Sequence, residues 1–349
     1  MASELMLALE LLEKEKKINK EELLETLRSS LAGAYRKYYD AGEDVTVDID
    51  AEGGILVHAK KTVVEEVEDS ATEITLEQAK LIDPKYQVGD VVVIETTPKN
   101  FGRIAAQNAK QMLVQHIREA ERGRMYSEYH EKENDVIVGT VQKIEKRGVL
   151  VEIGSTETLM PQHEQAPGEV YKPGQKLPVY VTEVRNTTKG LQITVSRTHP
   201  GLVRRLFERE VPEIANGTVE IKSIAREAGS RSKIAVVSKN PNVDAVGACV
   251  GQKGARVSAV LRGLGEEKVD VVKYNEDPAV FITESISPAR VLRVTLDEEN
   301  NAAEVIVPEF QLSLAIGKEG QNARLAAKLT GWKIDIKSDK EVGEVFQLG

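Results

Sequence analysis

The C-terminal part of this 349-residue chain contains an internal repeat, which restricts what the chain can fold into. Residues 250–254, with the sequence VGQKG, correspond to residues 316–320, IGKEG, at an offset of 66. Residues 268–271, KVDV, correspond to residues 333–336, KIDI, at an offset of 65. Each unit is predicted to have the order helix, strand, strand, short helix, GxxG loop, helix, strand. Repetition of this kind indicates two duplicated modules rather than one irregular domain.

The chemistry of each GxxG motif suits phosphate binding. The motif glycines have no Cβ atom, so a sugar–phosphate backbone can approach the loop closely. The helix predicted after each loop directs free N–H groups and its positive dipole end toward the loop, which favours phosphate. KH modules clamp about four nucleotides of RNA in this way, and two KH modules are therefore predicted. The alternative is a pair of glycine-rich structural turns.

The predicted RNA-binding residues are the loop positions and the polar or charged residues that follow them. They are Gly251, Gln252, Lys253, Gly254 and Arg256 in the first unit, and Gly317, Lys318, Gly320, Gln321, Asn322 and Arg324 in the second. Glu319 lies inside the second loop and would repel phosphate. The first loop is therefore expected to clamp RNA more firmly.

From Asp135 onward, before the repeat, the sequence pattern changes to short strands separated by turn signals. The predicted strands span residues 137–144, 148–153, 176–184 and 191–196. About five short strands in about 65 residues predict a small closed β-barrel.

The first hundred or so residues are predicted to form an α+β domain. Residues 3–17 have apolar positions at helical spacing, and a capping-box pattern at Asn19 and Glu22 starts a second helix that ends near residue 39. The predicted strands of this region span residues 45–49, 55–60, 63–67 and 91–95.

Residues 102–130 are predicted to form one long connecting helix. Basic side chains cluster on one side of it, namely Arg103, Lys110, Arg118, Arg122 and Arg124. Two interpretations stay open: an ordinary solvated face, or a basic rail along which RNA or an acidic partner runs.

The net charge of −9 at first argues against nucleic-acid binding, but the charge is unevenly distributed. Residues 1–132 contain 26 acidic and 18 basic residues, a net charge of −8, whereas residues 133–349 contain 30 and 29, a net charge of −1. An RNA-binding protein needs basic residues on one face rather than a basic total. The acidic first third suits a basic protein surface, or serves solubility alone.

Several classes of protein are disfavoured by the sequence. No run of about 18 apolar residues and no secretory leader is present, so the chain is expected to be cytoplasmic, without a membrane association. Its single cysteine, Cys249, fits a reducing compartment and is expected to be a buried core residue. No GxxxxGK[ST] loop occurs and the five histidines have no metal-ligand spacing, so neither an enzyme nor a cofactor or metal site is predicted.

Five stretches carry a resemblance to a known family: residues 101–107, 196–201, 226–229, 247–251 and 312–329. Over nearly its whole length the sequence resembles the NusA family of bacterial transcription factors. The resemblance implies that the barrel is an S1 domain of OB type and that the two KH domains are of the prokaryotic, type II kind. The overall class is then multidomain α+β, with an α+β N-terminal domain and a long connecting helix. The expected boundaries are residues 1–130, 133–199, 200–276 and 277–344.

The resemblance also implies a function. The N-terminal domain would dock on bacterial RNA polymerase near the RNA exit channel, and the S1 and KH domains would contact nascent single-stranded RNA. Such a factor modulates pausing, intrinsic termination and antitermination, and works with other antitermination factors. A monomer is expected, and the S1–KH joint around residues 200–210 is expected to be helical and tight, so that the RNA modules form one rigid rod.

Two departures from the family pattern qualify this picture. Some relatives carry acidic C-terminal repeats, whereas this chain ends at Gly349, so regulation through such a tail is not expected. The strand at residues 148–152 has no aromatic residue for base stacking, so the barrel is expected to hold RNA weakly or mainly to position the KH pair. His163 and Tyr171 are the remaining candidates for RNA contact in the barrel, with an ordinary polar surface residue as the favoured interpretation of His163.

Two other functions compete with this one. A ribosome-assembly RNA-binding factor would have the same modules but a different partner. An S1–KH subunit of an RNA-degrading enzyme would need a large catalytic core, and no segment resembles one.

Overall fold

The computed structural model describes residues 20–39, 44–50, 54–98, 101–187 and 190–341. The helix predicted at residues 3–17 lies outside these ranges. The chain forms two compact units, residues 1–125 and residues 126–349, and each is described by itself. The long helix α4 (Phe101–His130) runs from the first unit into the second, one residue longer than predicted.

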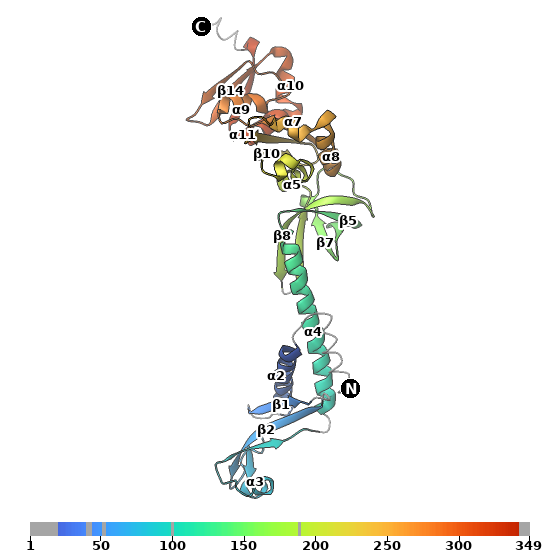
Figure 1. The fold of residues 1–349 in the computed structure, drawn as a ribbon, viewed down its shortest axis with the longest axis vertical. Helices are drawn as coiled ribbons and strands as arrows, with labels where there is room; N and C mark the ends of the chain where they lie inside the picture. Colours follow the sequence, from blue (N-terminus) through green and yellow to red (C-terminus); the bar gives the residue numbers. More distant parts are fainter. Residues whose placement is uncertain (1–19, 40–43, 51–53, 99–100, 188–189, 342–349) are drawn as a thin grey trace. The chain divides into compact units, whose positions relative to one another are not determined.

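The first unit combines a mixed sheet with helices (Figure 1). Its elements are α2 (Lys20–Tyr39), β1 (Val45–Ile49), β2 (Ile55–Val64), β3 (Glu73–Thr75), α3 (Leu76–Ile82) and β4 (Val91–Glu95). Strand β2 pairs antiparallel with β1 and β4 and parallel with β3. The prediction of separate strands at 55–60 and 63–67 was wrong: residues 60–62 continue the strand because they pair with residues 91–93 of β4.

The second unit begins with a five-stranded antiparallel sheet. Its strands are β5 (Val136–Glu145), β6 (Gly148–Ile153), β7 (Thr156–Pro161), β8 (Lys176–Thr187) and β9 (Gly190–Ser196), in the order β7-β6-β5-β8-β9. The edge strands β7 and β9 lie together, and the Thr158 hydroxyl donates a hydrogen bond to the Ile193 carbonyl. No backbone ladder joins these two strands within the described residues. This five-stranded sheet, which lies where the S1 domain was expected and is called the S1 sheet below, therefore curls without the fully closed ladder that was expected.

The end of α4 completes the core of this sheet. Tyr129 is 1% exposed, packs among the apolar residues of the S1 sheet, and donates its hydroxyl proton to the Ile153 carbonyl. Tyr126 packs against the same core. The S1 core therefore includes residues that precede the expected boundary at 133.

The two repeat units follow, and each has the predicted order of elements. The first consists of α5 (Pro200–Glu210), α6 (Pro212–Ala215), β10 (Val219–Glu227), β11 (Arg231–Ser238), α7 (Ala245–Val250), α8 (Ala255–Leu264) and β12 (Lys268–Lys273). The second consists of α9 (Pro278–Ser285), β13 (Arg293–Asp297), β14 (Ala302–Val307), α10 (Leu312–Ile316), α11 (Gln321–Thr330) and β15 (Lys333–Ser338). In both, the first two strands are antiparallel and the last two are parallel. The prediction of two duplicated α+β modules is confirmed.

Apolar cores join the three modules of the second unit. Helix α5 buries Leu202, Val203, Leu206 and Phe207 in a core that includes residues of both the S1 sheet and the first KH module. A second core places the outer face of the first KH sheet against α9 and α11 of the second KH module. The joint predicted at residues 200–210 is therefore a packed helix.

Candidate nucleic-acid interface

The first glycine of each GxxG loop adopts a conformation that only glycine tolerates. Gly251 has φ 75° and ψ 174°, and Gly317 has φ 78° and ψ 172°. A Cβ atom at Gly251 would lie 2.8 Å from Cγ of Arg256, and one at Gly317 would lie 2.9 Å from the backbone nitrogen of Asn322. The two loops therefore share one backbone path, and that path excludes side chains at its first position.

The last two residues of each loop are left-handed and lead into a helix whose N-terminus suits an anion. Lys253 (φ 50°, ψ 29°) and Glu319 (φ 53°, ψ 28°) are left-handed, and each is followed by a left-handed glycine, Gly254 or Gly320. Neither α8 nor α11 has a side-chain cap at its N-terminus. The first N–H groups of each helix, at the positive end of its dipole, therefore have no side-chain cap.

The two loops differ in charge. Gln252 and Lys253 are exposed in the first loop, which carries one positive charge. Lys318 and Glu319 are exposed in the second loop, and their charges cancel. This difference supports the expectation that the first loop holds phosphate more firmly.

Arg256 supports the first loop through hydrogen bonds and packing within the protein. Its Nη1 donates hydrogen bonds to Oε2 of Glu213 at 2.9 Å and to the Ala248 carbonyl at 2.6 Å. Its aliphatic stem also packs against Gly251. The side chain is one-third exposed, so its guanidinium is largely engaged within the protein.

Asn322 plays a comparable part in the second module. It is 4% exposed, and its Nδ2 donates to the carbonyls of Ile286 at 3.0 Å and Ala315 at 2.9 Å. Its buried Oδ1 has no hydrogen-bond partner among the described residues. The side chain ties α11 to the ends of α9 and α10 and supports the loop from inside.

Gln321 and Arg324 contact the first KH module. The Nε2 of Gln321 donates to Glu227, and the guanidinium of Arg324 forms a bidentate ion pair with the same carboxylate. The structure thus brings the predicted residues together around each loop, but it directs the polar groups of Arg256, Asn322, Gln321 and Arg324 into protein contacts.

The predicted basic rail lies on α4. Lys110, Arg118 and Arg124 are exposed and Arg122 is half-buried, whereas the side chain of Arg103 lies outside the described part. Exposure alone fits both interpretations of this face, and the rail stays a prediction.

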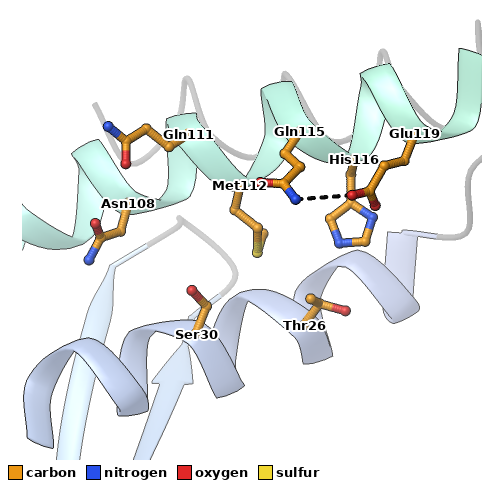
Figure 2. A pocket seen from close by; sticks show the side chains of 8 residues that line it. All are labelled: Thr26, Ser30, Asn108, Gln111, Met112, Gln115, His116 and Glu119. Carbon is orange, nitrogen blue, oxygen red and sulfur yellow. Dashed lines mark hydrogen bonds between the residues drawn. The ribbon is translucent and has the colours of Figure 1, made fainter. Parts of the chain in front are cut away.

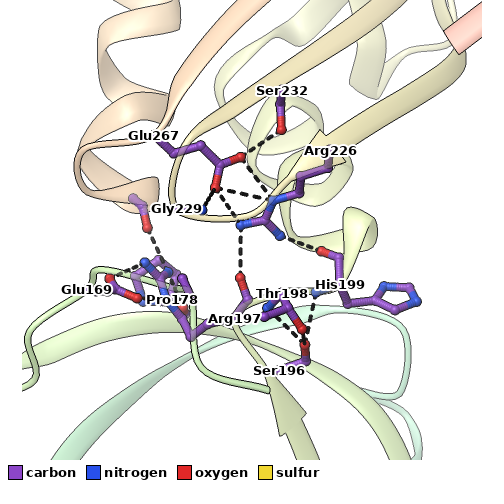
Figure 3. A network of polar contacts seen from close by, with 12 residues as sticks. Glu169, Pro178, Ser196, Arg197, Thr198, His199, Arg226, Gly229, Ser232 and Glu267 are labelled. Carbon is purple, nitrogen blue, oxygen red and sulfur yellow. Dashed lines mark hydrogen bonds and ion pairs between the residues drawn. The ribbon is translucent and has the colours of Figure 1, made fainter. Parts of the chain in front are cut away.

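A buried polar network joins the S1 sheet to the first KH module, and sequence reasoning missed it (Figure 3). Arg197 is 2% exposed and pairs with Glu169 through Nη2–Oε1 at 2.5 Å. Its Nη1 donates to the carbonyls of Pro178 and Gly263, each at 2.8 Å. Gly263 belongs to the KH helix α8, so one arginine holds both modules.

Arg226 forms the second half of this network. It pairs with the buried Glu267 at 2.9 Å and donates to the carbonyls of Arg197 at 2.8 Å and His199 at 2.7 Å. Glu267 also accepts hydrogen bonds from the Gly229 N–H and the Ser232 hydroxyl. Buried charges need such pairing because their desolvation is costly. The only sequence signal was that Arg197 and Arg226 lie within stretches that resemble the family.

A buried lysine joins the two KH modules. Lys233 is 0% exposed, pairs with Asp270 at 3.2 Å, and donates to the Ser287 carbonyl of the second module at 2.8 Å. Burial lowers the pKa of Lys233, and the neighbouring Asp270 opposes this shift.

Two residues considered for RNA contact in the S1 sheet lie in different environments. His163 is exposed, with 77% of its side chain accessible. Tyr171 is 8% exposed in the core and donates to Glu169 at 2.8 Å, and burial raises its pKa. Tyr171 is therefore a core residue and is no longer a candidate for RNA contact. Cys249 is 0% exposed, as predicted, and burial raises its pKa to about 12.

The first unit contains a polar pocket that the sequence did not indicate (Figure 2). It has a volume of about 380 Å³ and lies between Thr26 and Ser30 of α2 and several residues of α4. On the α4 side, the Nε2 of Gln115 donates to Glu119 at 3.0 Å. Within the described ranges, no cluster of three His, Cys, Asp or Glu side chains is arranged to bind a metal ion.

The curled S1 sheet and the two GxxG modules define an RNA-binding protein of the S1–KH class. The chain matches the families described as the NusA N-terminal domain over residues 4–123, the S1 RNA binding domain over 130–196, the NusA-like first KH domain over 197–274 and the NusA-like second KH domain over 278–344. The chain belongs to the NusA family.

Two relatives, the NusA proteins of Bacillus subtilis and Thermus thermophilus, support this assignment. The transcription termination/antitermination protein NusA of Bacillus subtilis (strain 168) is 55% identical over 346 residues, which cover 99% of this chain and 93% of that protein. The protein of the same name from Thermus thermophilus is 44% identical over 349 residues, 97% of this chain and 90% of the relative. The solution structure of the N-terminal domain of the B. subtilis protein is 52% identical, covers 35% of this chain and 99% of that one, and has a TM-score of 0.31.

No helix within the described ranges has the length and apolar character that spanning a bilayer requires.

Proposed function

We propose that this protein is a transcription factor that binds nascent single-stranded RNA through its second unit and bacterial RNA polymerase through its first. In this role it modulates pausing, intrinsic termination and antitermination, together with other antitermination factors. The observation that carries the proposal is the pair of GxxG loops with one shared backbone path, held in one packed body with an S1 sheet. The names of the B. subtilis and T. thermophilus relatives support the same role.

The proposed RNA contacts are the loop backbones and the exposed loop side chains. Gln252, Lys253 and Lys318 face solvent beside uncapped helix N-termini, where a phosphate group would be favoured. The remaining predicted residues, Arg256, Gln321, Asn322 and Arg324, would act mainly by holding the loops in shape. The protein would act by binding alone, as a cytoplasmic monomer without catalysis.

The proposed functional regions keep the expected boundaries, with residues 1–130 for polymerase, 133–199 for S1, and 200–276 and 277–344 for the KH modules. Experiments with fragments should nevertheless divide the chain before Tyr126, because Tyr126 and Tyr129 belong to the S1 core. A fragment that begins at residue 133 would lack both tyrosines.

The test is a pull-down of bacterial RNA polymerase with residues 1–125 and, separately, with residues 126–349, combined with RNA-binding measurements on both. We expect the first fragment to retain polymerase and the second to bind single-stranded RNA. Retention of polymerase by residues 126–349 alone would reverse the assignment of roles. Retention by neither fragment, with co-sedimentation of the full chain with a ribosomal subunit, would replace polymerase with the ribosome as the partner.

A further inference from the structure

The turn between β10 and β11 of the first KH module touches the GxxG helix of the second. Glu227, the last residue of β10, accepts hydrogen bonds from Nε of Arg324 at 2.6 Å and from Nη2 of Arg324 at 3.1 Å. These two residues are 97 positions apart in the chain. The pair is bidentate, which is the geometry in which arginine binds a carboxylate most strongly.

The same arginine also holds the backbone of the second loop. The Nη1 of Arg324 donates to the Glu319 carbonyl at 3.0 Å, and Glu319 is the left-handed residue inside the GxxG motif. Three of the five N–H donors of the guanidinium are therefore directed to protein acceptors. A continuous path of polar contacts leads from a carboxylate of one module to the loop backbone of the next.

A second contact runs parallel to the first. Nε2 of Gln321, the first residue of α11, donates to Glu227 at 2.8 Å and to the Ser230 hydroxyl at 2.7 Å. Beneath these polar groups, Leu325 and Leu329 of α11 pack on the first KH sheet. Helix α11 is therefore anchored to the first module over its first turn and along its apolar face.

We propose that Glu227 is a positioning residue for the second GxxG loop: through Arg324 and Gln321, a carboxylate of the first KH module sets the backbone geometry with which the second module meets RNA. The inference rests on the proposed function, since it assumes that this loop binds RNA. Removal of the carboxylate leaves Arg324 without its bidentate partner, so the Glu319 carbonyl and the start of α11 lose their support.

Whether removal of Glu227 weakens or strengthens RNA binding distinguishes the positioning role from a second possible role, in which Glu227 only blocks Arg324. If Glu227 only occupied Arg324 in place of an RNA phosphate, its removal would free a cation and strengthen RNA binding. If Glu227 positions the loop, its removal weakens RNA binding, although the variant is one negative charge less repulsive to RNA. Simple electrostatics and positioning thus predict opposite outcomes.

The experiment measures how much Glu227→Gln changes the RNA affinity of the full chain in three proteins: the wild type, a variant whose first loop is disabled by Gln252→Asp with Lys253→Asp, and a variant whose second loop is disabled by Lys318→Asp with Glu319→Asp. We expect Glu227→Gln to weaken RNA binding about fivefold in the wild type and in the variant with the disabled first loop. It should have no further effect in the variant with the disabled second loop. Glu304→Gln, which breaks a 2.5 Å ion pair with Lys337 elsewhere in the second module, is the matched control and should leave affinity unchanged.

Amide hydrogen exchange tests the positioning role of Glu227 without RNA. Amides of residues 317–321 should exchange faster in Glu227→Gln than in the wild type, whereas those of residues 251–254 should not change. Unchanged or stronger RNA binding by Glu227→Gln, in a protein whose disabled second loop does weaken binding, would overturn the positioning role. Unchanged binding with the second loop disabled would instead remove that loop from the proposed function, and the exchange rates would then decide the positioning role alone.

Discussion

Arg226 and Glu227 are consecutive residues of β10, yet their side chains bind different modules. Arg226 donates to the carbonyls of Arg197 and His199 at the S1 joint, and Glu227 accepts from Arg324 of the second KH module. Successive side chains of a strand point to opposite faces, so one short segment can reach both neighbours. The end of β10 thus links all three modules of the second unit.

The buried ion pair at the S1 side of this segment should be costly to break. Arg226→Met leaves Glu267 with no counter-ion in a site where its side chain is 0% exposed, so we expect the free energy of unfolding to fall by about 3–5 kcal/mol. Urea denaturation of residues 126–349 followed by circular dichroism measures this change. Arg185→Met is the control because its pair with Glu183 is also short, at 2.5 Å, but largely exposed; it should cost less than about 1 kcal/mol. Equal losses in the two variants would contradict the special role of burial.

Charge reversal in the middle of the loops should weaken RNA binding while leaving the fold intact. Gln252→Asp with Lys253→Asp changes the first loop from a charge of +1 to −2, whereas Lys318→Asp with Glu319→Asp changes the second from 0 to −2. We therefore expect the first double variant to lose more affinity and to reduce the salt dependence of binding. Filter binding at several salt concentrations measures both quantities. Gln78→Asp with Lys80→Asp, at exposed positions of α3 in the first unit, is the control with the same change of charge as the first-loop variant. A loss there equal to that in the first loop would argue against clamping by the KH loops.

The loop glycines themselves are poor sites for such tests. An aspartate at Gly251 or Gly317 would repel phosphate, but a Cβ atom there meets neighbouring atoms at under 3.0 Å, so the variant would also disturb the loop. We expect Gly317→Ala to lower the free energy of unfolding by about 1–3 kcal/mol. The single tryptophan, Trp332, lies in the same module and reports its unfolding by fluorescence. Gly331→Ala should cost at most half as much, since a Cβ atom at Gly331 (φ 78°) would meet no other atom within 4 Å; a reversed order would refute the steric argument.

Some of this architecture follows from local sequence and some does not. The two KH modules could be predicted because a GxxG motif, its flanking helices and its strands are short-range patterns that occur twice. Strand β3 was missed because three residues are too few to show a period, and the Tyr129 contribution to the S1 core was missed because it comes from a helix assigned elsewhere. The Glu227–Arg324 pair joins residues 97 positions apart, and no local pattern distinguishes them from other charged surface residues.

His199 should make the S1–KH joint sensitive to acid. Its Nδ1 accepts a hydrogen bond from the Gly201 N–H at 3.0 Å as the N-cap of α5, and its ring stacks on Tyr180 with centroids 4.6 Å apart. Burial lowers the pKa of His199 below 6.5, with Glu164 opposing the shift and Arg226 adding to it. Protonation would also remove the lone pair that caps the helix.

The direction of the pH effect follows from this depressed pKa. The unfolded chain binds the proton more readily than the folded chain, so the contribution of neutral His199 is fully present above pH 6.5 and is lost as the pH falls below that value. We expect His199→Asn, which keeps a capping side chain but does not titrate, to lose less stability than the wild type between about pH 7.5 and about pH 5.5. His163→Asn, at an exposed position, should follow the wild type. If all three proteins lost the same stability over this range, the acid sensitivity would have to come from groups other than the cap of α5.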